Sequence, residues 1–191
     1  MLRARLQAWG LSDQFLCPQL PASPRAAFQL AQELIAASAA HTAPTQLAVI
    51  GSSLGGYYAT ALAEKLACRA VLLNPAVAPT QDLQRHIGVT TAWHSTERVD
   101  FKPEYIAELG ELAVPAITQA QRYLLLAATG DEVLDWRAMA AHYPGAHQHI
   151  IQGSDHGLSD FDLYIDQVLQ FCGVAQPHPH PHPTFSKHTA H

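Results

Sequence analysis

The 191-residue sequence predicts an α/β domain whose mostly parallel sheet is covered by helices on both faces. Four short apolar runs of the buried-strand type, at residues 47–50, 70–74, 123–128 and 147–151, alternate with stretches of helical periodicity. A content of 48% hydrophobic and 14% charged residues suits one globular unit with its own core. Because strand-end loops on such a sheet gather at one edge, we expect the functional residues there.

The N-terminal part predicts two helices before the first strand. Three apolar side chains fall on one side of a short helix that Gly10 can end. Ser23 and Pro24 mark the start of a second helix, expected to reach about residue 40, because serine caps a helix and proline fits its first turn. Between the two helices, residues 15–17 form a brief apolar run that a proline stops.

The remaining chain continues the alternation of strands and helices. An alanine-rich helix is expected over residues 54–67, and further helices over 136–142 and 161–171. The segment 77–121 is more polar and contains three prolines, so it fits an inserted cap better than sheet core. We therefore assign residues 1–173 to one domain that carries this cap.

The C-terminal residues 174–191 differ from the domain in composition. They contain the run P-H-P-H-P-H-P, which predicts an extended, low-complexity tail. Alternating prolines hold the histidines in no closed site, so a solvated tail is preferred to a metal-binding one. A metal-binding accessory role for this tail stays the weakest of the functional alternatives.

Composition and charge narrow the classes of partner. The formal net charge of −5 leaves no basic footprint for nucleic acid. No run approaches the ~20 apolar residues of a membrane span, and the first residues lack the apolar stretch of a signal peptide. The three widely spaced cysteines, without a C-x-x-C pair, suit reduced thiols in a cytoplasmic protein. We thus expect no nucleic acid and no membrane partner; the oligomeric state stays open, although an exposed sheet edge would favour pairing.

A G-x-S-x-G motif, made by Gly51, Ser53 and Gly55, directly follows the first strand. This is the pattern of a nucleophile elbow, where a strand turns sharply into a helix with a serine at the apex. The turn needs small residues on both sides of the serine, because its backbone is strained and the neighbouring chain passes close. Ser53 is therefore the candidate nucleophile.

A serine hydroxyl needs a general base within hydrogen-bond reach. Elbow hydrolases carry serine, acid and histidine in that chain order, and the sequence offers this order once. Asp131 follows the strand 123–128, and His156 follows the strand 147–151. His156 would take the serine proton, while Asp131 would orient the imidazole and stabilise its charged form.

Simpler interpretations exist for each of these residues. Asp131 could cap the following helix, and His156 could be an ordinary surface-loop histidine. Asp135 is the rival acid but is expected at a helix start, and Asp155 is expected to serve a loop turn. His147 and His149 alternate on the last strand and could form a pair of metal ligands. No metal site is predicted there, because no third ligand lies at a suitable spacing in the sequence. The histidines expected to be surface or structural are His86, His94, His142, His147 and His149.

With Ser53, Asp131 and His156 placed, the chain resembles the small bacterial esterase family of α/β-hydrolases that includes YqiA and YcfP. The resemblance implies an α/β-hydrolase three-layer sandwich, and a serine ester or thioester hydrolase without a cofactor. The YqiA-like branch is the closer match, and the motifs follow the family's order over roughly residues 2–173. They are P-Q-L-P (18–21), G-S-S-L-G-G-Y-Y-A-T (51–60), L-N-P-A-V (73–77), T-G-D-E-V-L-D (129–135) and G-S-D-H-G (153–157).

The sequence departs from this family at its start. Members begin with an apolar strand beside the elbow strand, and it leads into an H-G-F-type loop that supplies N–H donors to the oxyanion hole. No H-G dipeptide precedes Ser53, so the oxyanion donor left is the N–H of Leu54, without its usual partner. The sheet should lose an inner strand unless residues 15–17 move in to pair with residues 47–50. We therefore expect an N-terminally shortened version, through a misplaced start or a real truncation.

The sequence as a whole predicts a serine esterase or thioesterase that cleaves a small-molecule ester or thioester through an acyl-enzyme on Ser53. The alternative is a non-catalytic or weakly active α/β-hydrolase-like binding protein, because the oxyanion loop is missing. Tyr57 and Tyr58 could line an acyl pocket under the cap or belong to the core.

Overall fold

A four-stranded parallel sheet forms the centre of the computed structural model, which describes residues 1–38, 46–80 and 102–176. Neighbours in sequence are neighbours in the sheet, and all three pairings are parallel, with Ser52 level with Leu73 and Leu73 level with Leu126. The carboxyl ends of the strands therefore meet at one edge. The strands are β1 (Ala48–Ser52), β2 (Arg69–Leu73), β3 (Tyr123–Ala128) and β4 (His147–Ile151).

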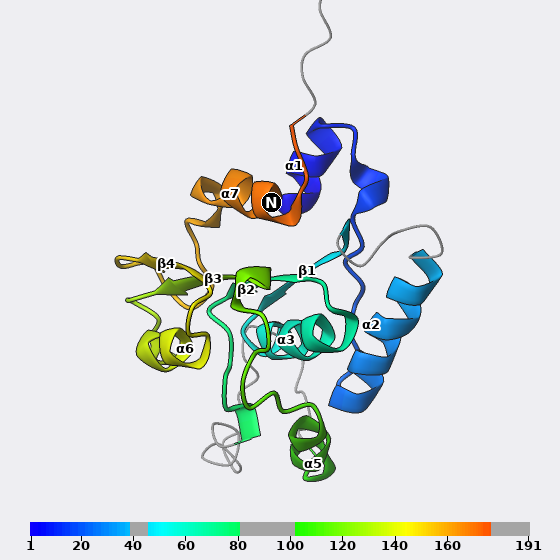
Figure 1. Cartoon of the computed structure of the whole chain (residues 1–191), viewed down its shortest axis with the longest axis vertical. Helices are drawn as coiled ribbons and strands as arrows, with labels where there is room; N and C mark the ends of the chain where they lie inside the picture. The colour runs from blue at the N-terminus through cyan, green and yellow to red at the C-terminus, as the bar shows by residue number, and fades with distance from the viewer. Residues whose placement is uncertain (39–45, 81–101, 177–191) are drawn as a thin grey trace, which may run out of the picture.

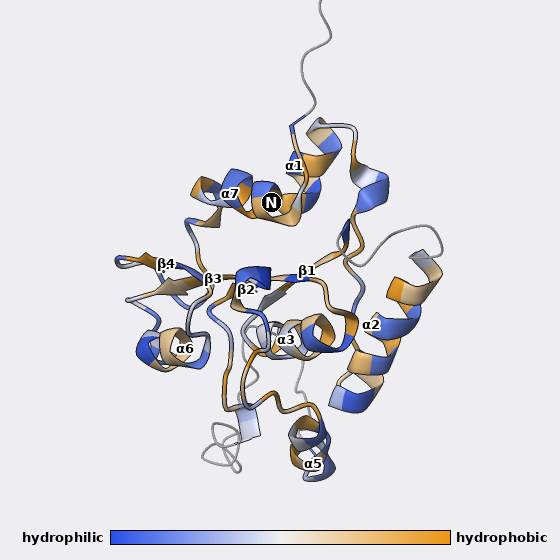
Figure 2. Cartoon of the chain, in the orientation of Figure 1, coloured by the Kyte–Doolittle hydropathy of each residue, from blue (hydrophilic) through white to orange (hydrophobic). Residues whose placement is uncertain are grey.

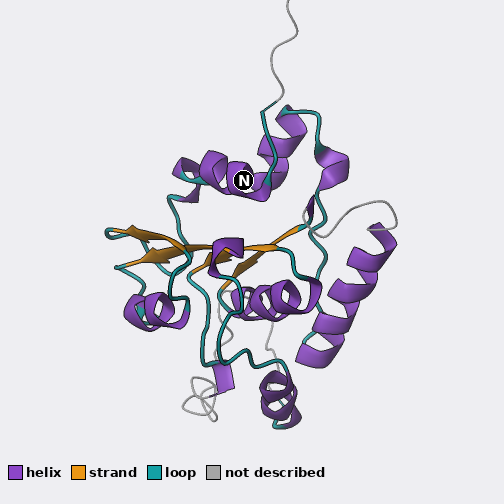
Figure 3. Cartoon of the chain, viewed as in Figure 1, coloured by secondary structure: helices purple, strands orange, loops and turns teal. Residues whose placement is uncertain are grey.

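Helices cover both faces of this sheet. Helices α1 and α7 lie on one face, and α3 and α6 lie on the other (Figure 1; Figure 3). None of the helices in the described ranges combines the length and the apolar character needed to cross a membrane. The α-helices are α1 (Leu2–Ala8), α2 (Pro24–Ser38), α3 (Leu54–Leu66), α5 (Glu104–Glu111), α6 (Trp136–His142) and α7 (Ile165–Cys172).

Strand β3 shows why the sheet is buried on both sides. All six of its residues are buried, and alternate side chains enter two different cores. Tyr123, Leu125 and Ala127 pack toward α3 and α6, whereas the other three pack toward α1 and α7. Such continuous apolar runs are typical of parallel strands, and Figure 2 shows mainly hydrophobic residues along the strands. The predicted parallel sheet with helices on both faces is confirmed.

Most helix and strand limits agree with the sequence analysis. The cap of α2 is at Ser23, as predicted, because its hydroxyl oxygen accepts the N–H of Ala26 at 3.2 Å. The closing helix differs from the prediction of one continuous helix. A short 3₁₀ turn, Phe161–Leu163, precedes α7 because the N–H groups of Leu163 and Tyr164 bond three residues back.

Strand β1 is an edge of the sheet within the described residues. It pairs with β2, and no described strand lies on its other side. Residues 15–17 do not pair with β1; Phe15 packs instead against the core under α1 and α7. Phe15, Cys17, Ser52 and Leu73 are among the residues that line an open depression of about 360 Å³. The described part of the sheet therefore lacks a strand beside β1, as expected from the sequence. The alternative, in which residues 15–17 pair with β1 in place of that strand, does not occur.

Helix α5 belongs to the segment 77–121 that the sequence analysis assigns to a cap; residues 81–101 and the tail from residue 177 lie outside the described ranges. The helix packs on α2 and α3 through Leu109, which shares a buried cluster with Tyr57 and Tyr58. The Tyr57 hydroxyl donates to the Leu109 carbonyl at 2.7 Å, and Ser23 Oγ donates to Glu108 at 2.7 Å. Both tyrosines are therefore core residues.

Candidate functional site

The backbone at Ser53 forms a sharp turn between β1 and α3. Its φ of 52° and ψ of −121° lie in a region that non-glycine residues rarely occupy. Neighbouring segments hold this strained conformation in place. The Ser53 N–H donates to the Leu73 carbonyl at 3.0 Å, and its carbonyl accepts from the N–H groups of Gly56 at 2.9 Å and Ala76 at 3.0 Å. The turn presents Ser53 at the carboxyl edge of the sheet, as expected of a nucleophile elbow.

Leu54, the residue proposed as oxyanion donor, is the first residue of α3. The first N–H groups of a helix have no partner within the helix, and they lie at the positive end of its dipole. Its position next to Ser53 is therefore suited to an anion that forms at the serine.

The glycines around Ser53 do not contribute equally to the turn. A Cβ on Gly51 would lie 2.0 Å from the carbonyl oxygen of Gly55, and a Cβ on Gly56 would lie 2.6 Å from the Pro75 Cβ. A Cβ on Gly55 would meet nothing within 4 Å. The small residue that the turn requires after the serine is therefore Gly56, which the motif does not include, rather than Gly55. The sequence alone could not distinguish the two, because the difference comes from the approach of Pro75.

Replacing Gly51 by alanine is expected to destabilise the fold by at least about 3 kcal/mol, because its methyl group meets backbone atoms that cannot rotate away. Gly55→Ala is the matched control and is expected to keep or raise stability by up to about 1 kcal/mol, since alanine favours a helix. Urea unfolding of both variants measures the difference. Equal stabilities would show that the elbow relaxes around a side chain at position 51.

The structure brings Ser53, His156 and Asp131 together. His156 Nε2 lies 3.0 Å from Ser53 Oγ, and His156 Nδ1 lies 2.9 and 3.0 Å from the two carboxylate oxygens of Asp131. The Asp131 side chain is fully buried and that of His156 is 5% exposed. With the proton on Nδ1, the ring donates to Asp131 and its Nε2 accepts from the Ser53 hydroxyl. These are the distances that a serine nucleophile, a general base and an orienting acid would need.

Asp131 also holds its own turn, but it does not cap the following helix, which was the alternative interpretation of this residue. Its Oδ1 accepts the N–H groups of Val133 at 2.8 Å and Leu134 at 2.9 Å. The rival acid, Asp135, caps α6 by accepting the Arg137 N–H at 2.9 Å. The structure thus keeps Asp135 away from the imidazole and at a helix start, as predicted.

Asp155 has the loop role that the sequence analysis expected. Its Oδ1 accepts the N–H of Ser159 at 2.9 Å, and this hydrogen bond is the main cause that lowers the pKa of the Asp155 carboxyl. Asp155 therefore stabilises the loop that carries His156, and the ring nitrogen of His156 faces Asp131 instead.

The loops that carry Asp131 and His156 are packed backbone to backbone. The Thr129 N–H donates to the Ile151 carbonyl at 2.8 Å, and the Gly130 N–H donates to the Gly153 carbonyl at 3.0 Å. A Cβ on Gly130 would lie 2.3 Å from the carbonyl oxygen of Ser154. This close contact explains why glycine stands directly before Asp131 in the T-G-D sequence.

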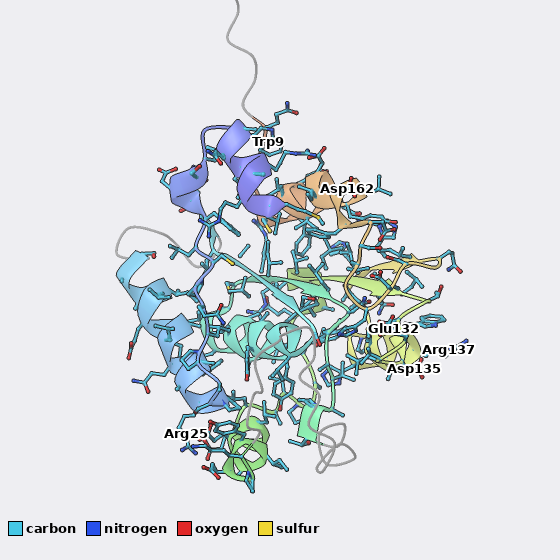
Figure 4. All side chains as sticks on the ribbon, turned by 180° about the vertical axis from the view of Figure 1, so that it is seen from behind. Trp9, Arg25, Glu132, Asp135, Arg137 and Asp162 are labelled. Atoms are coloured by element: carbon cyan, nitrogen blue, oxygen red, sulfur yellow. The ribbon has the colours of Figure 1, made fainter. Side chains whose placement is uncertain are left out.

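Two further residues touch the His156 loop, and the sequence analysis did not single them out. The Glu132 carboxylate accepts the backbone N–H of His156 at 3.0 Å. Hydrogen bonds from the backbone N–H groups of Glu132 and His156 lower the pKa of the Glu132 carboxyl. Figure 4 shows Glu132 near Asp135, at the loop that leads into α6. Asn74, fully buried, follows β2 directly. The sequence did contain a signal for Asn74, because it is a polar residue at the end of an apolar run predicted to be a buried strand. For Glu132 the sequence offered no signal except its position next to Asp131.

The remaining described histidines lie away from Ser53. His147 and His149 stand on strand β4, where their rings pack against Phe171 and Tyr164. His149 Nδ1 also lies 2.9 Å from the side-chain oxygen of Gln167. No group of three or more metal-binding side chains gathers in the part of the chain that the structure describes. His86 and His94 lie outside that part.

Solved structures of low sequence identity share this fold. A candidate hydrolase from Agrobacterium vitis S4 has a TM-score of 0.60 and 17% identity, with 78% of this chain and 69% of that chain covered. Mouse alpha/beta hydrolase domain-containing protein 10 has a TM-score of 0.55 and 17% identity, with 79% and 70% covered. Tomato methylketone synthase I with bound beta-ketoheptanoate has a TM-score of 0.53 and 14% identity, with 78% and 77% covered. The fold is α/β-hydrolase-like, as the sequence resemblance implied.

Comparison of the sequence with known protein families identifies the family of this chain. The profile of the uncharacterised protein family UPF0227 matches residues 1–173, which include the elbow, the Asp131 loop and the His156 loop. The match ends where the His/Pro-rich tail begins and agrees with the predicted resemblance to YqiA-like proteins. Because it covers nearly all of the 191 residues, the chain belongs to the family UPF0227.

Proposed function

We propose that this protein is a serine hydrolase that cleaves small carboxylic esters or thioesters through an acyl-enzyme on Ser53. The observation that carries the proposal is the position of His156, 3.0 Å from Ser53 Oγ and 2.9 Å from Asp131. The His156 imidazole lies between a serine at a strained turn and a buried carboxylate. A histidine with only a structural role would require neither of these neighbours. The α/β-hydrolase-like fold supports the same reaction class by analogy.

In the acylation step, Ser53 Oγ attacks the carbonyl carbon of the substrate while His156 Nε2 takes the hydroxyl proton. Asp131 keeps the imidazole oriented and stabilises its positive charge. The Leu54 N–H faces the negative charge that develops on the carbonyl oxygen. When the bond to the leaving group breaks, His156 gives its proton to the departing alcohol or thiol, and the acyl group stays on Ser53.

Deacylation repeats the same steps with water. His156 Nε2 takes a proton from a water molecule, whose oxygen attacks the acyl carbon. The bond to Ser53 Oγ then breaks, and the proton on His156 returns to that oxygen. A carboxylic acid leaves, and the serine is regenerated without a cofactor.

The open side of β1 favours a second candidate function, a weakly active or non-catalytic binding protein. In related hydrolase folds, N–H donors from two segments hold the oxyanion, and removal of one donor lowers the rate by about 10²–10³-fold. Leu54 provides one such donor, whereas no described strand lies on the outer side of β1 to carry a second segment. We therefore expect activated esters to be turned over better than unactivated ones.

Labelling with a fluorophosphonate distinguishes the two candidates, because only an activated serine reacts with this probe. We expect one label per chain, and peptide mass mapping should place it on Ser53. Heat-unfolded protein serves as the control for nonspecific labelling. A folded chain that takes up no label, or takes it up at another residue, would leave the binding protein as the better interpretation.

A further inference from the structure

Asn74 lies at the junction of the three segments that carry Ser53, Asp131 and His156. It follows β2 with a φ of 41°, in the left-handed region that asparagine tolerates better than most residues. Its N–H donates to the Leu126 carbonyl of β3 at 2.9 Å. Two residues later, the Ala76 N–H holds the carbonyl of Ser53 at 3.0 Å. The end of β2 therefore contacts both the elbow and the strand before the Asp131 loop.

The Asn74 side chain extends this connection to the His156 loop. Its Oδ1 accepts the N–H of Ala128 at 2.8 Å, and its Nδ2 donates to the carbonyl oxygens of Asp155 and His156, both at 3.0 Å. This network permits one orientation of the amide, because an N–H faces one end and two carbonyls face the other. The residue is fully buried, so water cannot replace these partners.

We infer that Asn74 is a positioning residue for the proposed hydrolysis: its amide fixes the His156 loop relative to the Asp131 loop. Ala128 ends β3, three residues before Asp131, and the two carbonyls belong to the segment that carries the imidazole. Asn74 touches no reacting atom and acts through the backbone. Loss of its donors should displace the imidazole, and a displacement of about 1 Å at a reacting group can cost on the order of 10²-fold in rate.

Aspartate at this position separates positioning from packing. Asn74→Asp keeps the shape of the side chain and the acceptor for the Ala128 N–H. A carboxyl, however, has no NH₂ group: it donates to neither carbonyl when ionised and to at most one when protonated, so the connection to the histidine loop loses at least one of its two hydrogen bonds. Asn74→Gly removes all three hydrogen bonds, and glycine adopts the observed φ without strain. Tyr143→Phe is the control, because it removes a buried hydroxyl that lies 2.9 Å from Thr60 Oγ1, in the core between the sheet and helices α3 and α6.

The test compares the full-length wild-type chain with these three variants. Steady-state hydrolysis of p-nitrophenyl acetate gives kcat and KM, thermal melting gives stability, and proton NMR of ¹⁵N-histidine-labelled protein follows the Nδ1–H signal of His156. We expect Asn74→Asp to lower kcat by about 10²-fold with KM changed less than about threefold, and to shift or broaden that signal. Tyr143→Phe is expected to lower the melting temperature while kcat stays within about twofold and the signal is unchanged.

Retention of kcat within about threefold and an unmoved Nδ1–H signal in Asn74→Asp would overturn the inference. If that variant does not fold, the same two readouts on Asn74→Gly decide. The inference rests on the proposed function, but their failures are distinguishable. A wild-type chain without esterase activity would refute the function, and the effect of Asn74→Asp on the His156 signal would still show whether Asn74 positions the imidazole.

Discussion

Replacing Ser53 by alanine is expected to reduce kcat for an activated ester by at least about 10⁴-fold, down to the background rate of solution hydrolysis. The physical reason is that the reaction runs through a covalent bond to Ser53 Oγ, which alanine does not have. Neither His156 nor Asp131 can take the place of the serine as nucleophile. A water molecule would have to occupy the position of the missing hydroxyl and attack the substrate directly. The measurement is steady-state hydrolysis of p-nitrophenyl acetate by the wild-type and variant proteins.

The Ser53→Ala variant should fold normally. Alanine tolerates the φ of 52° about as well as serine, and the elbow is held by backbone hydrogen bonds that the change does not touch. The side chain loses the hydrogen bond to His156 Nε2, so the stability should fall by only about 1 kcal/mol. Lost activity with a melting temperature lowered by only about 2–4 °C would therefore report chemistry and not unfolding.

Ser52→Ala is the matched control for this experiment. Ser52 is the neighbouring serine of the same motif, is exposed, and lines the open depression beside Phe15. We expect its kcat/KM to stay within about threefold of the wild type, because Ser52 has no part in the contact with His156. If Ser52→Ala loses activity and Ser53→Ala keeps it, the nucleophile has been assigned to the wrong serine.

The sheet could be predicted from the sequence because its strands are buried on both faces. A strand such as Tyr123–Ala128 must then be apolar at every position, and a continuous apolar run between turn residues is visible in any sequence. The positions of Ser53, Asp131 and His156 followed from the same logic, since each lies in the segment that follows a strand and the carboxyl ends of parallel strands share an edge. Topology, rather than any local signal, brings them together.

Contacts that depend on tertiary packing could not be predicted in this way. The different roles of Gly55 and Gly56 depend on Pro75, and the role of Asn74 depends on carbonyls about 80 residues away in the sequence. The open side of β1 was expected from the sequence, but its consequence for residues 15–17 was not. Phe15 is partly buried against the core under α1 and α7, and this contact between segments far apart in the sequence is not visible in the local pattern.

Replacing Asp131 by asparagine is expected to lower kcat by about 10³–10⁴-fold although the shape of the side chain is preserved. The amide oxygen can still accept the N–H groups of Val133 and Leu134, so the turn should survive. The amide NH₂ would then occupy the position of the second carboxylate oxygen, which lies 2.9 Å from His156 Nδ1. An amide donor at this position stabilises the imidazole that carries its proton on Nε2, whereas the carboxylate stabilises the form protonated on Nδ1.

An imidazole protonated on Nε2 presents a hydrogen to Ser53 Oγ and cannot take the serine proton. The loss should therefore appear in kcat, with KM changed less than about threefold, because the substrate does not contact Asp131. Fluorophosphonate labelling of Ser53 should slow by a similar factor, since it needs the same proton transfer.

Asp135→Asn is the control that separates the two candidate acids. Asparagine caps a helix about as well as aspartate, so α6 should keep its N-terminus, and the carboxylate that is lost is 60% exposed. We expect kcat to remain within about twofold of the wild type. If Asp135→Asn loses activity while Asp131→Asn keeps it within about tenfold, the buried carboxylate at position 131 is a turn cap and the proposed mechanism lacks its acid. If instead Asp131→Asn loses activity and Asp135→Asn keeps it, the Asp131 carboxylate is the group that sets the tautomer of the His156 imidazole.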